Sequence, residues 1–337
     1  MTTTTMPETR TRQFQIPATM KAAAIDRFGP PDVLTVHTVP TPQPGPGEVL
    51  IAVYGAGVGV WDADIRAGWW PSGKPKFPVV LGTDGAGIVV AKGPGVRRLA
   101  VGDRAWAYQF IGPKGGFYAE FVAVSAENAA PAPERLDLLH AGAAAVTGLT
   151  ALQGIDEHLG VRSGETVLIF GASGAVGTLA VQFAKRRNAT VIGAVRGRDA
   201  VRLVKELGAD AAIDVAKNDY PQQLQSLAPE GLDAALALAG GQPLETCLNS
   251  LKPGGRIAYP NGVDPAPRKR PGVKLTSYDA EAGPQQWTRL NRAVDQAKLE
   301  VPLAAVFPLA RAAKAHERIE KGHVLGRVAL RVRQERE

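Results

Sequence analysis

Residues 166–177 read TVLIFGASGAVG, an apolar run followed by three regularly spaced glycines. The run Thr166–Phe170 is typical of a strand that is buried on both faces, and the residues from about Ala175 to Arg187 have helical spacing. Between them, Gly171 permits a tight turn, and Gly177 permits close packing of the helix on the strand. The stretch therefore predicts a strand, a glycine-rich turn and a helix in direct succession.

The same alternation of strand and helix continues as far as Tyr278. Apolar strands are expected at residues 190–195, 211–214, 232–238, 256–259 and 273–278, with helices near 199–207, 221–227 and 243–251. Strands that are apolar throughout are expected when helices cover both faces of a parallel sheet. The pattern predicts a doubly wound α/β domain of the Rossmann type. With the Ala-rich helical segment that precedes it, this domain is expected to span residues 139–280.

The first part of the chain has a different sequence pattern. Short Val- and Ile-rich segments are separated by Gly and Pro, as in PTPQPGPGEVLIAVYGAGV at residues 40–58. This spacing predicts a β-rich, barrel-like domain over residues 20–138. Residues 281–337 revert to a helix, a loop and a last strand, which we expect to fold back on this first domain. The Thr-rich residues 1–19 are expected to be a disordered leader.

Composition disfavours several classes of protein. The chain has 337 residues, 45% hydrophobic and 21% charged, as expected of a globular protein with two domains. A single cysteine, Cys247, excludes an internal disulfide and any multi-thiolate zinc site. The net charge of +7 comes from short clusters without interleaved aromatic residues, which disfavours nucleic-acid binding. Apolar runs such as 141–152 are too short to cross a bilayer and no secretory signal is seen, so we expect no membrane association and a cytoplasmic location.

The glycine-rich turn is also a candidate phosphate site. Gly174 lets the backbone approach a pyrophosphate, and the start of the following helix presents unpaired N–H groups and partial positive charge. Within a run of strand–helix units, this pattern favours dinucleotide binding over a structural turn without a ligand. The residues predicted to hold the cofactor at this turn are Gly171, Ala172, Ser173, Gly174, Ala175, Val176 and Gly177.

The choice of cofactor depends on the end of the second strand of this domain, in the sequence VIGAVRGRD. An NAD site places an Asp or Glu there, about 20 residues after the glycines, to bond the ribose hydroxyls. Arg196 stands at that point and Arg198 follows, and guanidinium groups can pair with a 2′-phosphate. We therefore predict NADPH as the cofactor. The alternative is that both arginines are surface charge, and Asp199 is expected to be a helix N-cap.

These motifs, together with others in the same order, resemble a known family. The chain is similar to medium-chain dehydrogenase/reductases of the quinone oxidoreductase branch, over roughly residues 20–332. The further motifs are PGPGEVLIAV (44–53), GVGVWDADIRAG (57–68), VVLGTDGAGIVV (79–90), VGDRAW (101–106), AAAVTGLTAL (143–152), LKPGGRIAYPNG (251–262) and FPLARAAKAHERIEKGHVLGRVALRV (307–332).

The resemblance implies a GroES-like catalytic domain built from both ends of the chain, with a Rossmann cofactor domain between them. It also implies a homodimer, because relatives pair the strand expected near 272–278 across a two-fold axis. It places Thr147 near the nicotinamide. The nicotinamide pocket is then lined by residues 239–241, 261–263 and 325–326, and the expected contacts are Gly240, Asn261, Gly262, Leu325 and Gly326.

Zinc-dependent relatives carry a Cys and a His where this chain has Gly59 and Thr83, with Asp84 in place of a Glu. A third ligand would fall around residues 143–145, which are alanines, and residues 93–115 lack the cysteines of a structural zinc site. No metal site is therefore expected. Without a metal to polarise a carbonyl, hydride transfer suits an acceptor that spreads its own negative charge, such as a quinone or an α,β-unsaturated carbonyl.

The catalytic residues are left open by the sequence. Relatives usually carry Asn at the position of Gly59 and often Tyr at that of Asp64, so their assignments do not transfer. The substrate-cleft candidates are Tyr54, Trp61, Asp64 and Tyr108, and the aromatic ones could form an acceptor pocket with Trp69, Trp70 and Phe110. Ordinary packing is the alternative for each aromatic residue. The five histidines are expected at the surface or in packing roles.

The predicted function is therefore an NADPH-dependent quinone or enone oxidoreductase that acts on a small molecule without a metal. Two alternatives remain open. One is an enoyl-thioester reductase, which needs a long channel for a pantetheine arm. The other is a non-catalytic NADPH-binding protein that acts as a redox sensor.

Overall fold

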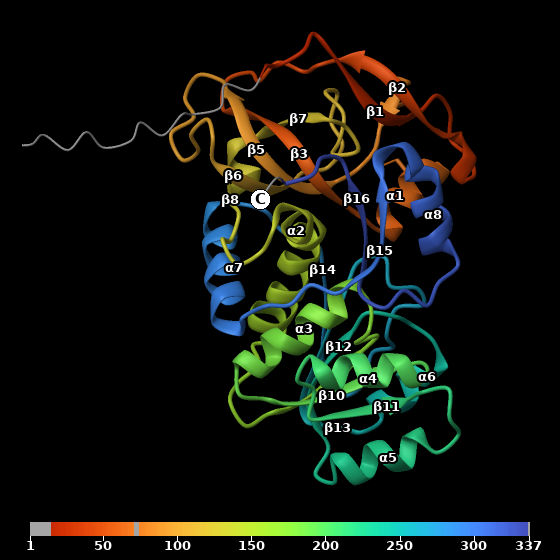
Figure 1. Ribbon diagram of the computed structural model, residues 1–337. Coiled ribbons are helices and arrows are strands. Elements are labelled where there is room, and N and C mark those ends of the chain that lie inside the picture. Colours follow the sequence, from red (N-terminus) through yellow and green to blue (C-terminus); the bar gives the residue numbers. More distant parts are fainter. Residues whose placement is uncertain (1–14, 71–73, 336–337) are drawn as a thin grey trace, which may run out of the picture.

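The computed structural model describes residues 15–70 and 74–335. Figure 1 shows a β-rich part at the top and, at the bottom, a parallel sheet covered by helices. The long helix α2 (Leu138–Gln153) lies between the two parts. The predicted fold class, a β-rich domain joined to a doubly wound domain of the Rossmann type, is confirmed.

The β-rich part contains two sheets. The larger has seven strands in the order β15-β16-β3-β5-β6-β8, and β7 pairs with the first half of β3. The smaller has the order β2-β1-β4. The strands are β1 (Thr19–Ile25), β2 (Leu34–Pro40), β3 (Glu48–Val58), β4 (Val79–Val80), β5 (Asp84–Lys92), β6 (Arg104–Tyr108), β7 (Phe121–Ser125), β8 (Ala129–Pro131), β15 (Leu303–Pro308) and β16 (Arg327–Arg331).

The residues after 281 complete the larger sheet. β16 pairs antiparallel with β3, with Val328 opposite Val58, and parallel with β15. Three helices flank this part of the molecule: α1 (Val60–Ala67), α7 (Pro284–Ala297) and α8 (Ala312–Glu320). The sequence predicted one helix, a loop and one strand after residue 281, so one strand and one helix were missed. The sequence LAAVFP of β15 is apolar, but the strand is only half-buried, and it is bracketed by Pro302 and Pro308, a pattern typical of loops.

The parallel sheet has six strands in the order β11-β10-β9-β12-β13-β14. Its elements are β9 (Thr166–Phe170), α3 (Ala175–Arg186), β10 (Thr190–Val195), α4 (Arg198–Glu206), β11 (Ala211–Asp214), α5 (Tyr220–Leu227), β12 (Leu232–Ala237), α6 (Gln242–Leu248), β13 (Leu251–Pro260) and β14 (Lys274–Tyr278). The predicted strands and helices lie within one or two residues of these, except around Leu251. There α6 ends earlier and β13 begins earlier than predicted, because the Pro-Gly-Gly sequence does not interrupt the strand.

Helix α2 joins the two parts through a shared core. Buried side chains of α2 belong to the same hydrophobic cluster as Trp106 in β6 and Phe183 in α3. The helix approaches β3 so closely that a Cβ atom at Gly142 would collide with the carbonyl oxygen of Gly55. The seven-stranded sheet is thereby held at a fixed place relative to the glycine-rich turn.

With its π-helical continuation, α2 extends over Leu138–His158. By length and composition alone these 21 residues could cross a membrane, which the shorter apolar run expected from the sequence could not. Its most apolar window is 78% buried inside the protein, as expected of a core helix. Residues 1–14 of the predicted leader lie outside the described residues, whereas Ile16 packs on the core and Thr19 begins β1.

Candidate functional site

The glycine-rich turn has the geometry that its sequence predicts. Gly171 has a φ of +83°, a left-handed conformation that favours glycine. A Cβ atom at Gly177 would collide with the carbonyl oxygen of Gly171, so this glycine is needed for helix packing. A Cβ atom at Gly174 would meet only that oxygen, at 3.5 Å, so the turn is open there. Gly174 is the N-cap of α3, and the first N–H groups of the helix are therefore available to an anion.

The end of β10 presents two unpaired cations. Arg196 and Arg198 are exposed, and among the described residues neither forms an ion pair or a side-chain hydrogen bond. The nearest acids are engaged elsewhere: Asp199 pairs with Arg202 at 3.2 Å, and Asp214 accepts backbone N–H groups. The predicted N-cap role of Asp199 is wrong, because α4 begins one residue earlier and its N-cap is Gly197.

The segments expected to line the nicotinamide pocket come to the same edge of the sheet. The N–H of Gly326 donates to the carbonyl oxygen of Ser173 at 2.8 Å, which joins residues 325–326 to the glycine-rich turn. A Cβ atom at Gly171 would lie 3.3 Å from Cβ of Leu238, so the β12 end borders the turn. Asn261 is exposed, but its amide nitrogen donates to Asp279 at 2.8 Å, which ties its side chain to a neighbouring loop.

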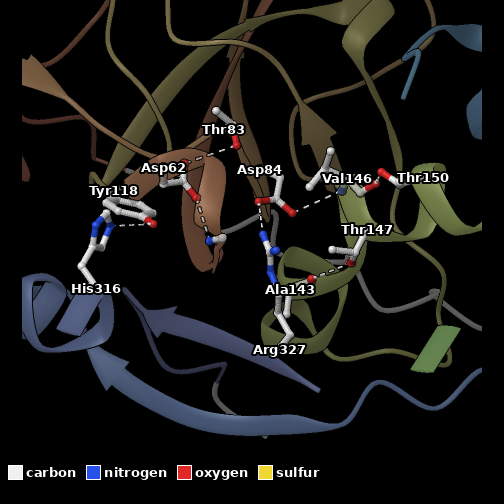
Figure 2. Close-up of polar contacts among 11 residues, drawn as sticks. Asp62, Thr83, Asp84, Tyr118, Ala143, Val146, Thr147, Thr150, His316 and Arg327 are labelled. Carbon is white, nitrogen blue, oxygen red and sulfur yellow. Dashed lines mark hydrogen bonds and ion pairs between the residues drawn. The ribbon is translucent and has the colours of Figure 1, made fainter. Parts of the chain in front are cut away.

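A buried ion pair lies one residue beyond Gly326. Arg327 Nη2 donates to Asp84 Oδ1 at 2.9 Å, and the other oxygen of this carboxylate accepts from the N–H of Val146 at 3.2 Å. Figure 2 shows Asp84 at the centre, with Arg327 below it and α2 to the right. Thr147, the residue expected near the nicotinamide, is buried there and its hydroxyl donates to the carbonyl of Ala143 at 3.2 Å. Asp84 itself is 0% exposed, so Arg327 provides its neutralising charge.

A second buried carboxylate, Asp62, lies beside Asp84 on the side away from α2 (Figure 2). It accepts from the N–H of Gly59 at 2.9 Å and from the hydroxyl of Thr83 at 3.3 Å. Burial, reinforced by the negative charge of Asp84, raises the pKa of Asp62 from 3.8 to about 6. Two buried acids thus share one arginine, which gives this site an excess of negative potential.

The wall behind Asp62 is a chain of buried polar groups (Figure 2). Tyr118 and His316 are 3.3 Å apart from hydroxyl to Nε2, and Arg66 Nη1 lies 3.2 Å from His316 Nδ1. Arg66 also pairs with Glu320. Burial, followed by the charge of Arg66, lowers the pKa of His316 to about 3, so the ring is neutral. The sequence missed Asp62 and Arg327 as site residues because each stands alone in its motif.

The four substrate-cleft candidates do not form one cluster. Trp61 lies in an aromatic cluster whose ring centroids are 4.4 Å (Trp61–Trp69), 6.4 Å (Trp61–Phe110) and 6.1 Å (Trp70–Phe110) apart. Tyr108 lies opposite Asp84 in the β5–β6 register, and burial followed by the charge of Asp84 raises its pKa to about 12. Asp64 is exposed on α1. Tyr54 packs against the same hydrophobic core cluster as Tyr108, whereas Trp61 and Phe110 pack against the other one.

The raised pKa of Asp62 predicts a pH dependence of stability. Because the folded protein holds this proton more tightly than the unfolded chain does, the stabilisation is complete below about pH 4 and is lost as pH rises through about 6. The variant Asp62→Asn should therefore be more stable than the parent above pH 6, by up to about 3 kcal/mol, and equal to it near pH 4. Thermal unfolding from about pH 4 to 8 measures this, and parallel profiles of the two proteins would contradict it.

Among the described residues, 15–70 and 74–335, no group of three or more His, Cys, Asp or Glu side chains is placed to hold a metal ion. The positions at which zinc-dependent relatives have ligands are occupied by a hydrogen-bonded Thr83 and by Gly59. A Cβ atom at Gly59 would lie 3.0 Å from Arg327 Nη1. A guanidinium group therefore borders the place where a thiolate would have to stand.

Comparisons with known proteins agree with this architecture. An alcohol dehydrogenase GroES-like domain family matches residues 45–134, and a zinc-binding dehydrogenase family matches residues 175–267. The quinone oxidoreductase of Rattus norvegicus is 31% identical over 313 residues, 89% of this chain and 94% of the relative. A solved NAD-dependent alcohol dehydrogenase has a TM-score of 0.86 and 32% identity, over 93% of this chain and 100% of that one. A mycobacterial protein solved in complex with NADPH has a TM-score of 0.81 and 29% identity, over 93% and 100% of the two chains.

Proposed function

This chain belongs to the quinone-oxidoreductase-like medium-chain dehydrogenase/reductases, and from that premise we propose that it transfers a hydride from NADPH to a quinone or an α,β-unsaturated carbonyl without a metal. Membership of the family makes it an oxidoreductase that uses a nicotinamide cofactor. The choice of NADPH, the class of acceptor and the independence of metal are the proposed parts. The observation that carries hydride transfer at this place is the direct chain link between the glycine-rich turn and the buried ion pair.

That link consists of two consecutive residues. Gly326 is hydrogen-bonded to Ser173 in the turn, and Arg327 is paired with Asp84 in the seven-stranded sheet. A dinucleotide whose pyrophosphate lies at the turn therefore directs its nicotinamide end toward Asp84, Arg327 and Thr147. When bound, the reduced nicotinamide supplies the hydride. The residues of this chain fix its position and exclude water, because the ion pair and Thr147 are buried.

The proposal of NADPH rests on the exposed arginines at the end of β10. The 2′-phosphate is the only difference between the two nicotinamide cofactors, so groups near that ribose must distinguish them. Arg196 and Arg198 offer two guanidinium groups that no carboxylate of the described residues neutralises. An acid at this strand end, as in an NAD site, would repel the phosphate.

Metal independence is supported by the chemistry of the side chains present. A hydroxyl that already donates to Asp62 and a glycine beside a guanidinium group are not ligands for zinc. Without a Lewis acid, the negative charge that develops on the acceptor must be delocalised by the acceptor itself. Quinones and enones meet this requirement, and the aromatic cluster around Trp61 and Phe110 offers flat apolar surface to such molecules.

The acceptor is tested by steady-state oxidation of NADPH with a panel of quinones, enones and enoyl thioesters. We expect turnover with a quinone or an enone and little with saturated ketones, since these cannot spread the charge. Turnover confined to enoyl thioesters would assign the enzyme to thioester reduction instead. Tight NADPH binding without turnover of any acceptor would contradict the proposal and favour a redox sensor.

Metal independence gives a separate prediction. Purified protein should contain no stoichiometric zinc, and incubation with a chelator should leave its activity unchanged, because the site lacks thiolate and imidazole ligands. Elemental analysis and activity before and after chelation measure this. About one zinc per chain, lost together with activity, would overturn the assignment.

A homodimer is the remaining proposal. β14 (Lys274–Tyr278) is the edge strand of the parallel sheet, and within the described part of the chain no further strand pairs with it. An open edge strand is a ready template for pairing with a second copy. We expect light scattering at micromolar concentration to give twice the chain mass, and a proline at Thr276 to yield the monomer. A monomeric parent would contradict the proposal.

A further inference from the structure

A single carboxylate ties together the two chain segments that leave the neighbouring strands β10 and β11. Asp214 is the last residue of β11 and lies opposite Val195 in the parallel register. Its Oδ1 accepts from the N–H of Gly197 at 2.9 Å and from the N–H of Ala216 at 3.0 Å. The same side chain therefore holds the start of the β10–α4 turn and the start of the β11–α5 turn.

The turn held in this way carries both predicted phosphate-binding arginines. Gly197 stands between Arg196 and Arg198 and has a φ of +91°, with open space where a side chain would be. It is also the N-cap of α4, and no side chain caps the helix there. A glycine without a packed neighbour has large conformational freedom. Its carbonyl oxygen accepts from Val201 in α4, and its hydrogen bond to Asp214 ties it to the neighbouring strand, so that bond helps to fix the direction of the flanking arginines.

The charges around Asp214 allow an acid to stand close to a phosphate site. The N–H of Gly197 is the largest cause that lowers the pKa of Asp214, and Lys217 and Arg196 lower it further. The carboxylate is thus anionic and directed at backbone donors. Asp199, the other acid of the turn, is bound by Arg202, which also lies 3.9 Å from Glu206. Within the described residues no carboxylate forms an ion pair with Arg196 or Arg198, so both side chains are available to an anionic ligand.

We propose that Asp214 is the positioning residue of the 2′-phosphate site, so that the selectivity for NADPH depends on a carboxylate that does not itself touch the phosphate. The proposal rests on the NADPH preference proposed above. The new element is that part of the selectivity lies in the neighbouring strand β11, in an acid. An acid close to a phosphate would ordinarily be expected to repel it.

The test compares two variants that remove the same charge but differ in hydrogen bonding. Asp214→Asn keeps an acceptor oxygen for the N–H of Gly197, whereas Asp214→Ala keeps none. Dissociation constants for NADPH and NADH, from fluorescence titration, give the preference of each protein. We expect Asp214→Ala to lower the preference for NADPH about five- to tenfold, since a charge-assisted hydrogen bond is lost. Asp214→Asn should keep the parent preference or exceed it.

Asp219→Ala is the matched control, because Asp219 lies on the same loop and its carboxylate contacts only exposed Gln223. It should leave the preference unchanged. Equal preferences for Asp214→Ala and Asp214→Asn would overturn the proposal, as would an equal loss of NADPH and NADH binding in Asp214→Ala, which would indicate a structural role alone. A parent that prefers NADH would instead refute the proposed cofactor, and this is seen before any variant is made.

Discussion

Replacing Arg327 with methionine is expected to lower the free energy of unfolding by about 3–5 kcal/mol at neutral pH. Asp84 is 0% exposed and Arg327 is its ion-pair partner, so the substitution leaves a buried carboxylate without a cation. Asp62, 1% exposed, adds like charge at the same place. The loss of unfolding free energy should be smaller at acidic pH, because the two carboxyl groups can then be neutral. Denaturant and thermal unfolding at two pH values measure it.

Two further variants show whether charge is the cause. Arg331→Met changes an exposed arginine of the same strand and should cost less than about 0.5 kcal/mol. The double variant Arg327→Met, Asp84→Asn should recover most of the loss, since it removes both members of the pair. A single Arg327 variant as stable as the Arg331 variant would mean that Asp84 is neutral in the folded protein.

Replacing Arg196 with alanine is expected to abolish most of the discrimination between the two cofactors. The parent should prefer NADPH by roughly ten- to a hundredfold, because a charge-assisted contact to the 2′-phosphate contributes about 1.5–3 kcal/mol. Arg196→Ala should weaken NADPH far more than NADH, and Arg198→Ala should do so to a smaller degree. The difference between the effects on NADPH and NADH affinity should be smaller at high salt, because salt screens charges at an exposed site.

Arg331→Ala is the control for general loss of charge. Arg331 is exposed on β16, outside the parallel sheet, so its removal should change the two affinities alike. Titration of each variant with both cofactors at low and high salt gives the comparison. If Arg196→Ala and Arg198→Ala bind both cofactors as the parent does, the arginines are surface charge.

The parallel domain could be predicted almost residue by residue from the sequence. Its strands are continuous apolar runs with both faces covered, and glycines mark the turns, so periodicity is enough to find them. β15 escaped prediction because prolines bracket it and because it is stabilised by pairing with β16, a contact that no local pattern reveals. Asp199 was misassigned because Gly197 already provides the N-cap conformation one residue before the helix begins.

The geometry of the glycine-rich turn could be predicted because it depends on seven consecutive residues, Gly171–Gly177. The buried charged group of the β-rich part could not be predicted. Its members Asp62, Asp84 and Arg327 come from three segments that meet only in the folded protein. Arg327 carries no local sign of its role: it reads as one more arginine in a basic strand.

The place of β16 in the large sheet sets an order for biosynthesis. β3 is paired with β16 along its second half, yet about 270 residues separate the two strands in the chain. On the ribosome, β3 emerges before the parallel sheet and can pair with its near neighbour β5, but its second half lacks its other partner until β16 has been made. Until then one edge of this half-strand presents unpaired backbone groups to the solvent. Ribosome-bound chains stalled before Arg327 should therefore be cut by protease within the β-rich part, whereas the parallel domain should resist.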